Sequence, residues 1–311
     1  MIYDAPQLSI IIVNYNGRQF LADCLDSIAR HVSCPHEVII VDNASRDGSC
    51  DFLRSHYPDV QLIESRVNTG FTGGNNLGAQ YARGKLLLLL NNDTRLVTDL
   101  SPVLRQFDDP QLGVLGCRLR YGDGRQQLSI GFDHTPMRLV LSWLGLGSIS
   151  ALPRWFRRSE MCLDKYAQDH ANVAWVSGAC LFTPRALWQQ VGGLDTGYFM
   201  YVEDVDYCKR VRLAGYRVAY TAAAEVVHYE GSGRAWVGGS ALRHTMHSYL
   251  RYSKKFHSSF SVLSLRALLA AVMLARALAY GVCTFFSRSQ IWQEKNKAYR
   301  AAAITLLKGA S

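Results

Sequence analysis

Short apolar runs alternate with amphipathic stretches through the first third of the chain, and this alternation constrains the fold more than any other feature. The clearest run is the five leucines at Leu86–Leu90, because an uninterrupted apolar run is typical of a strand buried on both faces. Similar runs predict strands at Leu8–Val13, Glu37–Val41 and Val60–Ile63. The stretches between them predict helices at Phe20–Ala29, Ser49–Tyr57 and Gly73–Ala82. We therefore expect an α/β fold with a mostly parallel, Rossmann-like sheet flanked by helices.

The remainder of the chain is less regular. Residues 122–171 are rich in Gly, Arg and aromatic residues with poor periodicity, so we expect loops and one short helix that cover the site. Beyond them the pattern predicts strands at Trp175–Thr183 and Arg217–Tyr220, and helices at Pro184–Val191 and Asp204–Leu213. Hydrophobic residues are 49% of the 311, enough for a full core in one large domain or in one domain plus an appendage.

The positive charge lies in the C-terminal region. Residues 231–311 carry twelve Lys and Arg and one acid, Glu294, so the net charge of this region is 12 − 1 = +11. The rest of the chain has a net charge of 22 − 24 = −2, which gives the whole chain its +9. The same region holds the apolar stretch Ser261–Phe286, which Arg266 and Arg276 interrupt. Ten residues apart, these arginines fall close to one helix face, which favours an amphipathic helix at an anionic membrane surface. The alternatives are a spanning helix and a helix packed on the catalytic domain. The apolar stretch argues against nucleic acid as the partner.

The cysteines indicate a reducing compartment. The eight cysteines form no CxxC pair and show no zinc-ligand spacing. Met1 runs almost directly into an apolar strand, with no charged segment or cleavage site of a signal peptide. We therefore expect free thiols and a cytoplasmic location, peripheral at the inner face of the membrane.

Polar residues cluster where the first predicted strands end, and ligands bind at that edge of an open α/β sheet. Asn14 and Asn16 follow the first strand, and Asp42 ends the second. Their amide and carboxylate groups suit hydrogen bonds to a base or a ribose, although Asn and Asp also shape turns and cap helices. Both interpretations stay open on these residues alone.

A second cluster, at residues 68–78, is rich in Gly and Asn and leads into a predicted helix. Glycines such as Gly70 let the backbone approach a ligand, and a helix start offers N–H groups to an anion. Asn68 and Asn75 belong to the same segment. The segment is neither a Walker loop nor a GxGxxG after the first strand, which argues against a dehydrogenase.

Two further clusters carry acids. Asn91, Asn92 and Asp93 directly follow the leucine run, where a plain Asx-capped turn is the alternative to an oxygen-ligand site for a hard cation. Glu203, Asp204 and Asp206 begin a predicted helix after several aromatic residues. Acids stabilise a helix start in any protein, but one of them can also serve as a general base. We expect Asp206 to pair with Arg210 four residues on.

The order and spacing of these four clusters resemble the family 2 glycosyltransferases, and most of all the rhamnosyltransferases of bacterial surface-polysaccharide assembly. The resemblance covers about residues 8–257. It implies the GT-A fold and a nucleotide-sugar donor beside these residues: Asn14, Asn16, Asp42, Asn68, Gly70, Asn75, Asn91, Asn92 and Asp93. It also implies a DxD-type metal site in which Asn91 replaces the first acid, and in which Asp93 and His228 hold Mg²⁺ or Mn²⁺.

The resemblance further makes Asp204 the catalytic base, with Glu203 supporting it or contacting the acceptor. It puts Gly178 and Ala179 where donor sugar and acceptor meet, although close strand packing explains small residues there equally well.

The function expected is inverting transfer of a sugar, by resemblance rhamnose from dTDP-rhamnose, to a glycan or polyprenyl-diphosphate-linked acceptor. The expected domains are a catalytic domain at 1–230, with the nucleotide-sugar side at about 1–120 and the acceptor side at about 121–230, and a helical, membrane-associating extension at 231–311. A non-catalytic nucleotide-sugar-binding protein of the same fold is the alternative; it would be expected to lack Asp93 or Asp204.

Overall fold

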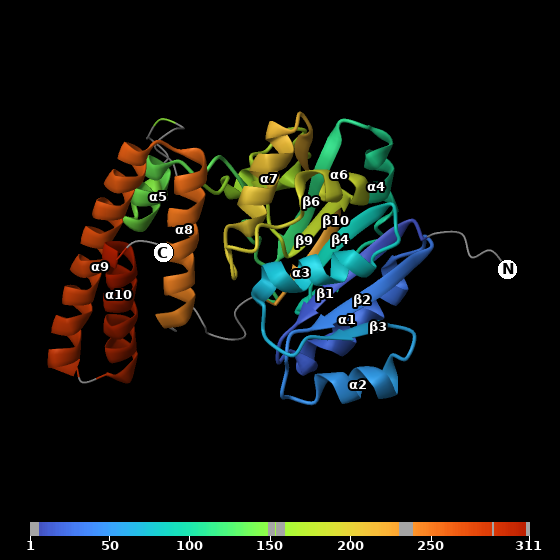
Figure 1. The fold of residues 1–311 in the computed structure, drawn as a ribbon, viewed down its shortest axis with the longest axis horizontal. Helices are drawn as coiled ribbons and strands as arrows, with labels where there is room; N and C mark the ends of the chain where they lie inside the picture. Colours follow the sequence, from blue (N-terminus) through green and yellow to red (C-terminus); the bar gives the residue numbers. More distant parts are fainter. Residues whose placement is uncertain (1–5, 149–152, 154–158, 230–238, 288, 309–311) are drawn as a thin grey trace. The chain divides into compact units, whose positions relative to one another are not determined.

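The computed structural model describes residues 6–148, 153, 159–229, 239–287 and 289–308 (Figure 1). They divide into two compact units. The first unit holds residues 1–131, 160–199 and 203–230, and with them every predicted site residue. The second holds residues 132–159, 200–202 and 231–311. The sequence grouped residues 132–159 with the catalytic part, whereas Leu139 and Val140 of this segment share a buried cluster with the C-terminal helices. The functional division at residue 230 stays a prediction.

An eight-stranded sheet forms the centre of the first unit, in the order β3-β2-β1-β4-β9-β6-β10-β5. Its strands are β1 (Leu8–Asn14), β2 (His36–Asp42), β3 (Gln61–Glu64), β4 (Leu86–Asn91), β5 (Thr94–Leu96), β6 (Leu112–Arg120), β9 (Cys180–Pro184) and β10 (Arg217–His228). Only β9 and β5 run against the direction of the other strands, so the expected mostly parallel α/β sheet is confirmed. A small second sheet pairs β7 (Ile130–Gly131) with β8 (Trp175–Val176).

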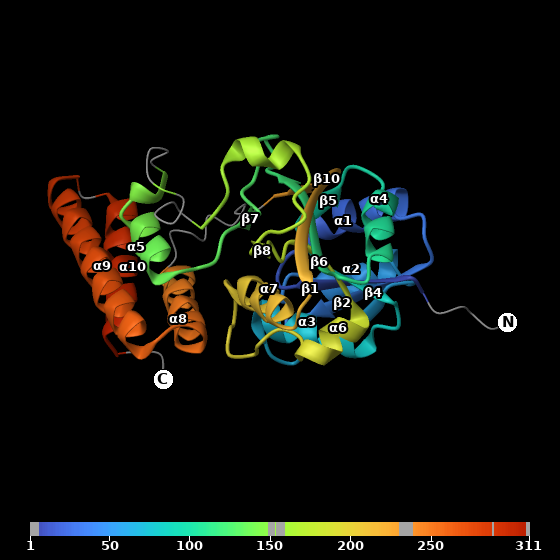
Figure 2. The same cartoon turned by 90° about the horizontal axis from the view of Figure 1, so that it is seen from above.

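Helices cover both faces of the large sheet (Figure 2). They are α1 (Arg18–His31), α2 (Ser49–His56), α3 (Gly70–Tyr81), α4 (Ser101–Leu104), α6 (Arg185–Val191) and α7 (Glu203–Leu213). The first unit also has short 3₁₀ helices at Arg105–Asp108 and Leu163–Ala167. Alternate residues of β1 divide the core. Ile10 and Ile12 belong to the buried cluster that contains the apolar side of α1, whereas Ile11 and Val13 lie against glycines of α3.

Several expected elements differ in extent. The strand expected at Trp175–Thr183 is two strands, β8 and β9, separated by a turn at Ser177–Ala179. Pro184 precedes α6 as its N-cap rather than occupying its first turn. The strand expected to end at Tyr220 continues to His228, because an irregularity between Thr221 and Glu225 lets β10 keep pairing with β6. The sequence did not predict β6 at all.

The second unit is helical. Its helices are α5 (Pro136–Trp143), α8 (Gly239–Phe256), α9 (Ser259–Ser287) and α10 (Gln290–Lys308). They share one buried cluster that includes Leu139, Met246, Leu265, Met273 and Ala302. The helix α9 is long and apolar enough to cross a membrane by length and composition. One face of α9 contributes to the buried cluster that it shares with α5, α8 and α10.

The arginines of α9 point into the helical unit rather than away from it. Arg266 donates hydrogen bonds to the carbonyls of Leu306 and Leu307, at the C-terminal end of α10. Arg276 donates to the hydroxyl of Tyr299 and to the carbonyl of Trp143. The polar face expected to be exposed is therefore turned inward. The exposed side chains of α9 between its terminal serines are all apolar, from Phe260 (79% exposed) to Phe286 (80% exposed).

Candidate active site

The fold brings the polar strand ends to one edge of the large sheet. The register of the parallel strands pairs Asn14 of β1 with Asp42 of β2, and Asn91 of β4 with the residue before Asn14. The strand β10 runs in the same direction and ends at His228. Because β9 runs the opposite way, the turn before it, at 177–179, lies at the same edge, where the carbonyl of Ala179 accepts the backbone N–H of Asn91 at 3.0 Å. Residues far apart in sequence thus meet at one place.

The first strand ends are joined by buried hydrogen bonds. The Asn14 amide donates to Asp42 Oδ2 at 2.9 Å, and the Asn92 amide donates to Asn14 Oδ1 at 2.7 Å. Both Asn14 and Asp42 are buried, and Asp42 also accepts the backbone N–H of Ser45. Asn16, in a left-handed conformation, joins this network through Ser45, because its backbone N–H donates to Ser45 Oγ at 2.9 Å; its Oδ1 accepts the Arg46 N–H. The network fixes the edge beside which a donor would lie.

The glycine-rich segment is held by its own side chains. Asn68 Oδ1 accepts the Gly70 N–H at 2.9 Å, and the buried Asn75 donates to the carbonyl of Phe71 at 2.9 Å. Gly70 has φ +73°, and a Cβ there would lie 2.1 Å from the carbonyl oxygen of Phe199. Only glycine meets both conditions. Asn68 and Asn75 therefore shape the start of α3, whatever they contact in a donor complex.

Asp93 and His228 form a close pair of acceptors. Asp93 Oδ1 lies 3.2 Å from His228 Nε2, and the backbone N–H of Tyr229 donates to the Asp93 carbonyl. The Asn91 amide lies 3.0 Å from the same Nε2. Adjacent ligands of an octahedral Mg²⁺ or Mn²⁺ are about 3 Å apart, since each bond is roughly 2.1 Å long. The pair therefore fits two neighbouring positions around such an ion.

Within the described residues, no group of three or more His, Cys, Asp and Glu side chains could hold a metal ion. The pair of Asp93 and His228 is thus smaller than a closed structural site. A pair of this kind suits a cation whose other positions are filled by phosphate oxygens and water.

The acids of α7 differ sharply in their surroundings. Asp204 is partly exposed, and its two oxygens accept the N–H groups of Gly178 at 2.9 Å and Val205 at 2.8 Å. Burial raises the pKa of Asp204, and these N–H groups oppose the rise. Glu203 is only 6% exposed, and its Oε2 has no hydrogen-bond partner among the residues that the structure describes. Burial, and then the charge of Asp204, raise the pKa of Glu203 well above its usual range. Glu203 is therefore poorly accessible to an acceptor.

An ion pair, two residues with positive φ and a packed glycine surround the start of α7. The expected pair of Asp206 and Arg210 is confirmed, with Arg210 Nε 2.6 Å from Asp206 Oδ2. Tyr201 and Val202, directly before α7, have φ of 70° and 69°, conformations that cost about 1–3 kcal/mol each and concentrate at functional sites. Gly178 is packed, since a Cβ there would lie 3.1 Å from the ring of Phe71.

The turn at 177–179 links Asp204 to the Asn91–Asp93 segment. The N–H of Gly178 donates to Asp204, and the carbonyl of Ala179 accepts from Asn91. Asp93 and Asp204 thus border one region, whereas Glu203 and Asp206 of the same helix start are buried. The sequence missed one buried neighbour of this region, Gln127, whose Oε1 lies 3.1 Å from His228 Nδ1. The irregular segment around Gln127 offered no periodic signal that would have singled it out.

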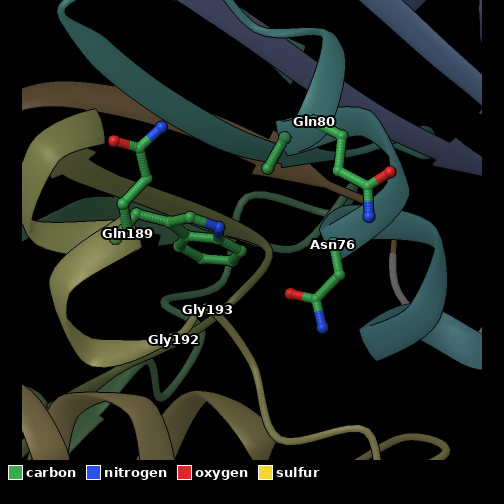
Figure 3. Close-up of a pocket in the computed structure, with 7 residues that line it drawn as sticks. Asn76, Gln80, Gln189, Gly192 and Gly193 are labelled. Atoms are coloured by element: carbon green, nitrogen blue, oxygen red, sulfur yellow. The ribbon is translucent and has the colours of Figure 1, made fainter.

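A separate cavity of about 320 Å³ lies between α3 and α6 (Figure 3). It is lined by Asn76, Ala79, Gln80, Trp188, Gln189, Gly192 and Gly193. Asn76 is bound on both sides, because it donates to the carbonyl of Leu194 and accepts its N–H. No predicted site residue lines this cavity, so it is distinct from the candidate active site.

Comparisons with known proteins agree with this geometry. Residues 9–158 match the family model described as Glycosyl transferase family 2. An N-acetylglucosaminyl-diphospho-decaprenol L-rhamnosyltransferase of Mycobacterium tuberculosis is 29% identical over 240 residues, 72% of this chain and 76% of the relative. The rhamnosyltransferase WbbL of Escherichia coli is 24% identical over 254 residues, 78% of this chain and 91% of the relative.

A solved structure extends the comparison to the fold. The mannosyltransferase PcManGT from Pyrobaculum calidifontis, in complex with GDP-Man and Mn²⁺, aligns with a TM-score of 0.58 at 17% identity, covering 98% of this chain and 88% of that one. At this identity the likeness concerns the fold alone. The family match, the named relatives and the fold together show that the chain carries a family 2 glycosyltransferase domain, has the GT-A fold and is a glycosyltransferase.

Proposed function

We propose that this glycosyltransferase moves rhamnose, with inversion, from dTDP-rhamnose to a polyprenyl-diphosphate-linked sugar or growing glycan in surface-polysaccharide synthesis. One observation supports a transferase site above all others. Asp93 Oδ1 lies 3.2 Å from His228 Nε2, beside the turn whose Gly178 N–H binds Asp204. The relatives named as rhamnosyltransferases support the sugar, and the mycobacterial name supports an acceptor on a lipid diphosphate.

The donor binds along the edge formed by β1, β2 and the start of α3. Asn14, Asn16 and Asp42 hold the nucleoside end, with Asn14 and Asp42 already oriented by their mutual hydrogen bond. Asn68, Gly70 and the rest of the glycine-rich segment lie beside the diphosphate. Gly70 keeps the segment close to Phe199, which leaves no room for a side chain between them.

Asp93 and His228 hold a divalent cation, and the solved relative with GDP-Man and Mn²⁺ supports this assignment. Bound there, Mg²⁺ or Mn²⁺ neutralises the charge that develops on the leaving diphosphate. Asn91 and Asn92 line the same turn. Asn91 donates to His228 in this structure, so it must turn away for His228 to bind the ion.

Asp204 removes the proton from the acceptor hydroxyl. The hydroxyl oxygen then forms a bond to the anomeric carbon as the bond from that carbon to the diphosphate oxygen breaks, and the nucleoside diphosphate leaves with the electron pair. The two backbone N–H groups orient the carboxylate, and its raised pKa makes it a stronger base than an exposed Asp. Gly178 and Ala179 border the meeting point of the two sugars, and Glu203 supports the helix start from within.

A donor screen tests this function. Purified protein is incubated with a synthetic lipid-diphosphate acceptor, Mn²⁺ and a panel of nucleotide sugars, and nucleoside diphosphate release is measured together with the glycan product. We expect dTDP-rhamnose to give acceptor-dependent turnover with an inverted linkage. Binding of a nucleotide sugar without turnover on any acceptor would instead indicate the non-catalytic binding protein.

The second unit attaches the enzyme to the inner face of the membrane. The outer face of α9 is apolar along the whole helix, and the C-terminal residues 231–311 carry a net charge of +11. Burial of apolar side chains and attraction to anionic lipid together stabilise a surface-bound state. A lipid-linked acceptor would then be available in the same plane.

Vesicle flotation tests the attachment. The double variant Leu278→Glu with Phe285→Glu adds two negative charges to the outer face of α9. The two side chains are 72% and 81% exposed, respectively. The control Gln290→Glu with Gln293→Glu adds the same two charges on exposed positions of α10. We expect only the first to abolish flotation with anionic vesicles. Equal flotation of both variants would rule out this face as the lipid contact, and loss of a dimer in the first variant alone would point to a second copy of the chain.

A further inference from the structure

We propose that Gln127 is a positioning residue that holds His228 in the tautomer required for metal binding. The proposal rests on the proposed metal-dependent function, since His228 is there a ligand of the divalent cation. Gln127 and His228 are both 5% exposed, and Gln127 Oε1 lies 3.1 Å from His228 Nδ1. Gln127 does not reach the cation itself; it acts through the ring.

Two hydrogen bonds define the same tautomer. An amide oxygen only accepts, so the contact with Gln127 requires the hydrogen on His228 Nδ1. An amide nitrogen only donates, so the contact with Asn91 Nδ2 at 3.0 Å requires a lone pair on His228 Nε2. A neutral imidazole has one hydrogen, and these partners on opposite sides of the ring agree on its position. Nε2 therefore faces Asp93 as an acceptor.

Asp93 alone would favour the opposite tautomer. Its Oδ1 lies 3.2 Å from Nε2, so a hydrogen on Nε2 would bond to this carboxylate. That bond would occupy both proposed ligands at once. Gln127 opposes it by binding the hydrogen at Nδ1. Nε2 then keeps a lone pair, which accepts from Asn91 in this structure and can bind an ion once Asn91 turns away. Partners of this kind typically contribute about 10–100-fold to metal affinity.

The backbone fixes Gln127 in place. Its N–H donates to the carbonyl of Leu119 at 3.0 Å, near the end of β6. The strand β6 pairs with β10 up to Val227, so the segment that follows β6 passes the end of β10 where His228 lies. Gln126 secures the same segment, because its amide donates to the carbonyls of Leu119 and Gln127. The position of Gln127 thus depends on backbone bonds that a side-chain substitution leaves intact.

Three variants separate this role from general packing. Gln127→Met keeps the length of the side chain and removes the acceptor, whereas Gln127→Glu keeps an acceptor. Gln126→Met loosens the same segment without touching His228. Metal-free proteins are titrated with Mn²⁺ in the presence of dTDP and followed by electron paramagnetic resonance. The histidine tautomer is read from ring ¹⁵N chemical shifts before metal is added.

We expect Gln127→Met to bind Mn²⁺ about 10–100-fold more weakly and to shift the His228 ring toward the Nε2–H tautomer. Gln127→Glu and Gln126→Met should bind Mn²⁺ within about threefold of the wild type, well below that range. Wild-type affinity together with a wild-type ring spectrum in Gln127→Met would overturn the proposal. Should Gln127→Met fail to fold, a wild-type ring with hydrogen on Nε2 would overturn it equally. A wild-type protein that binds no Mn²⁺ contradicts the proposed function instead, while the ring spectrum still tests the tautomer.

Discussion

Replacing Asp204 by Asn removes the proposed base while changing the structure very little. Both Asp204 oxygens accept backbone N–H groups, from Gly178 and from Val205. The Asn side chain has the same shape but only one oxygen, so one of these two bonds is lost. A hydrogen bond of this kind contributes about 0.5–1.5 kcal/mol to stability. A loss of that size leaves the protein folded and the proposed donor site intact. Donor affinity should therefore stay close to that of the wild type.

Loss of the base should instead lower kcat by about 10²–10⁴, or roughly 3–5 kcal/mol of transition-state stabilisation. The assay is release of nucleoside diphosphate by purified protein at saturating donor and acceptor, with donor affinity measured in parallel by calorimetry. Asp51→Asn is the matched control, because Asp51 also lies in the first turn of a helix but its side chain is 88% exposed. Transfer by Asp204→Asn at more than about a tenth of the wild-type rate would refute the assignment.

The pH profile gives a second measure of the same residue. Burial raises the pKa of Asp204, so the carboxylate gains its proton at a higher pH than an exposed Asp does. Activity should therefore fall as the pH decreases through that raised pKa, and the acid limb should disappear in Asp204→Asn. A wild-type rate that stays flat below the pKa of an ordinary Asp would contradict the base role.

Four further perturbations test other parts of the site. Excess EDTA should stop turnover, and Asp93→Ala should weaken donor and metal binding together; full turnover in EDTA would exclude a metal role for Asp93. Asp206→Ala should cost about 3–5 kcal/mol in the free energy of unfolding, measured by denaturant titration, because it leaves Arg210 partly buried without its carboxylate. Gly70→Ala should lower both stability and donor affinity, since its Cβ would clash with the carbonyl of Phe199; wild-type donor affinity in a folded variant would contradict that account.

The sequence was sufficient to predict the first parallel strands of the sheet because the signals there are local. Leu86–Leu90 is apolar throughout, and turn-forming residues follow it at Asn91–Asp93, so the strand and its end are both visible in the sequence. Parallel neighbours then place their ends at one edge. The hydrogen bond between Asn14 and Asp42 is a direct consequence of that register.

The strand β6 escaped prediction for a physical reason. Two glycines interrupt its sequence, and glycine in a strand normally indicates a weak strand or a bulge. Packing requires both of them here. A Cβ on Gly113 would lie 2.6 Å from Val211 of α7, and one on Gly116 would lie 2.7 Å from Val176 of β8. Contacts between distant segments therefore override the local preference, and they also bring Gln127 to His228.

Periodicity alone did not determine which way the charged face of α9 points. The spacing of Arg266 and Arg276 correctly indicates one shared face, but it does not tell which way the face points. Carbonyl groups at the end of α10 lack partners within their own helix, and Arg266 supplies donors to them. This requirement turns the charged face inward. The outer face is then left entirely apolar. The helix is therefore a packed helix of the bundle with an exposed apolar face, and not an independent amphipathic helix with an exposed charged face.

This orientation also decides which experiment can test membrane attachment. Truncation after Lys255 would remove α9 and α10, whose buried residues share one cluster with Leu242, Met246 and Leu250 of α8. The truncated chain would expose these three side chains, and insolubility or loss of activity would follow from the exposed α8 regardless of any lipid. Substitutions at exposed positions such as Leu278 leave that cluster intact. A loss of flotation that appears at Leu278 and Phe285, and not at Gln290 and Gln293, can then be assigned to the outer face of α9 itself.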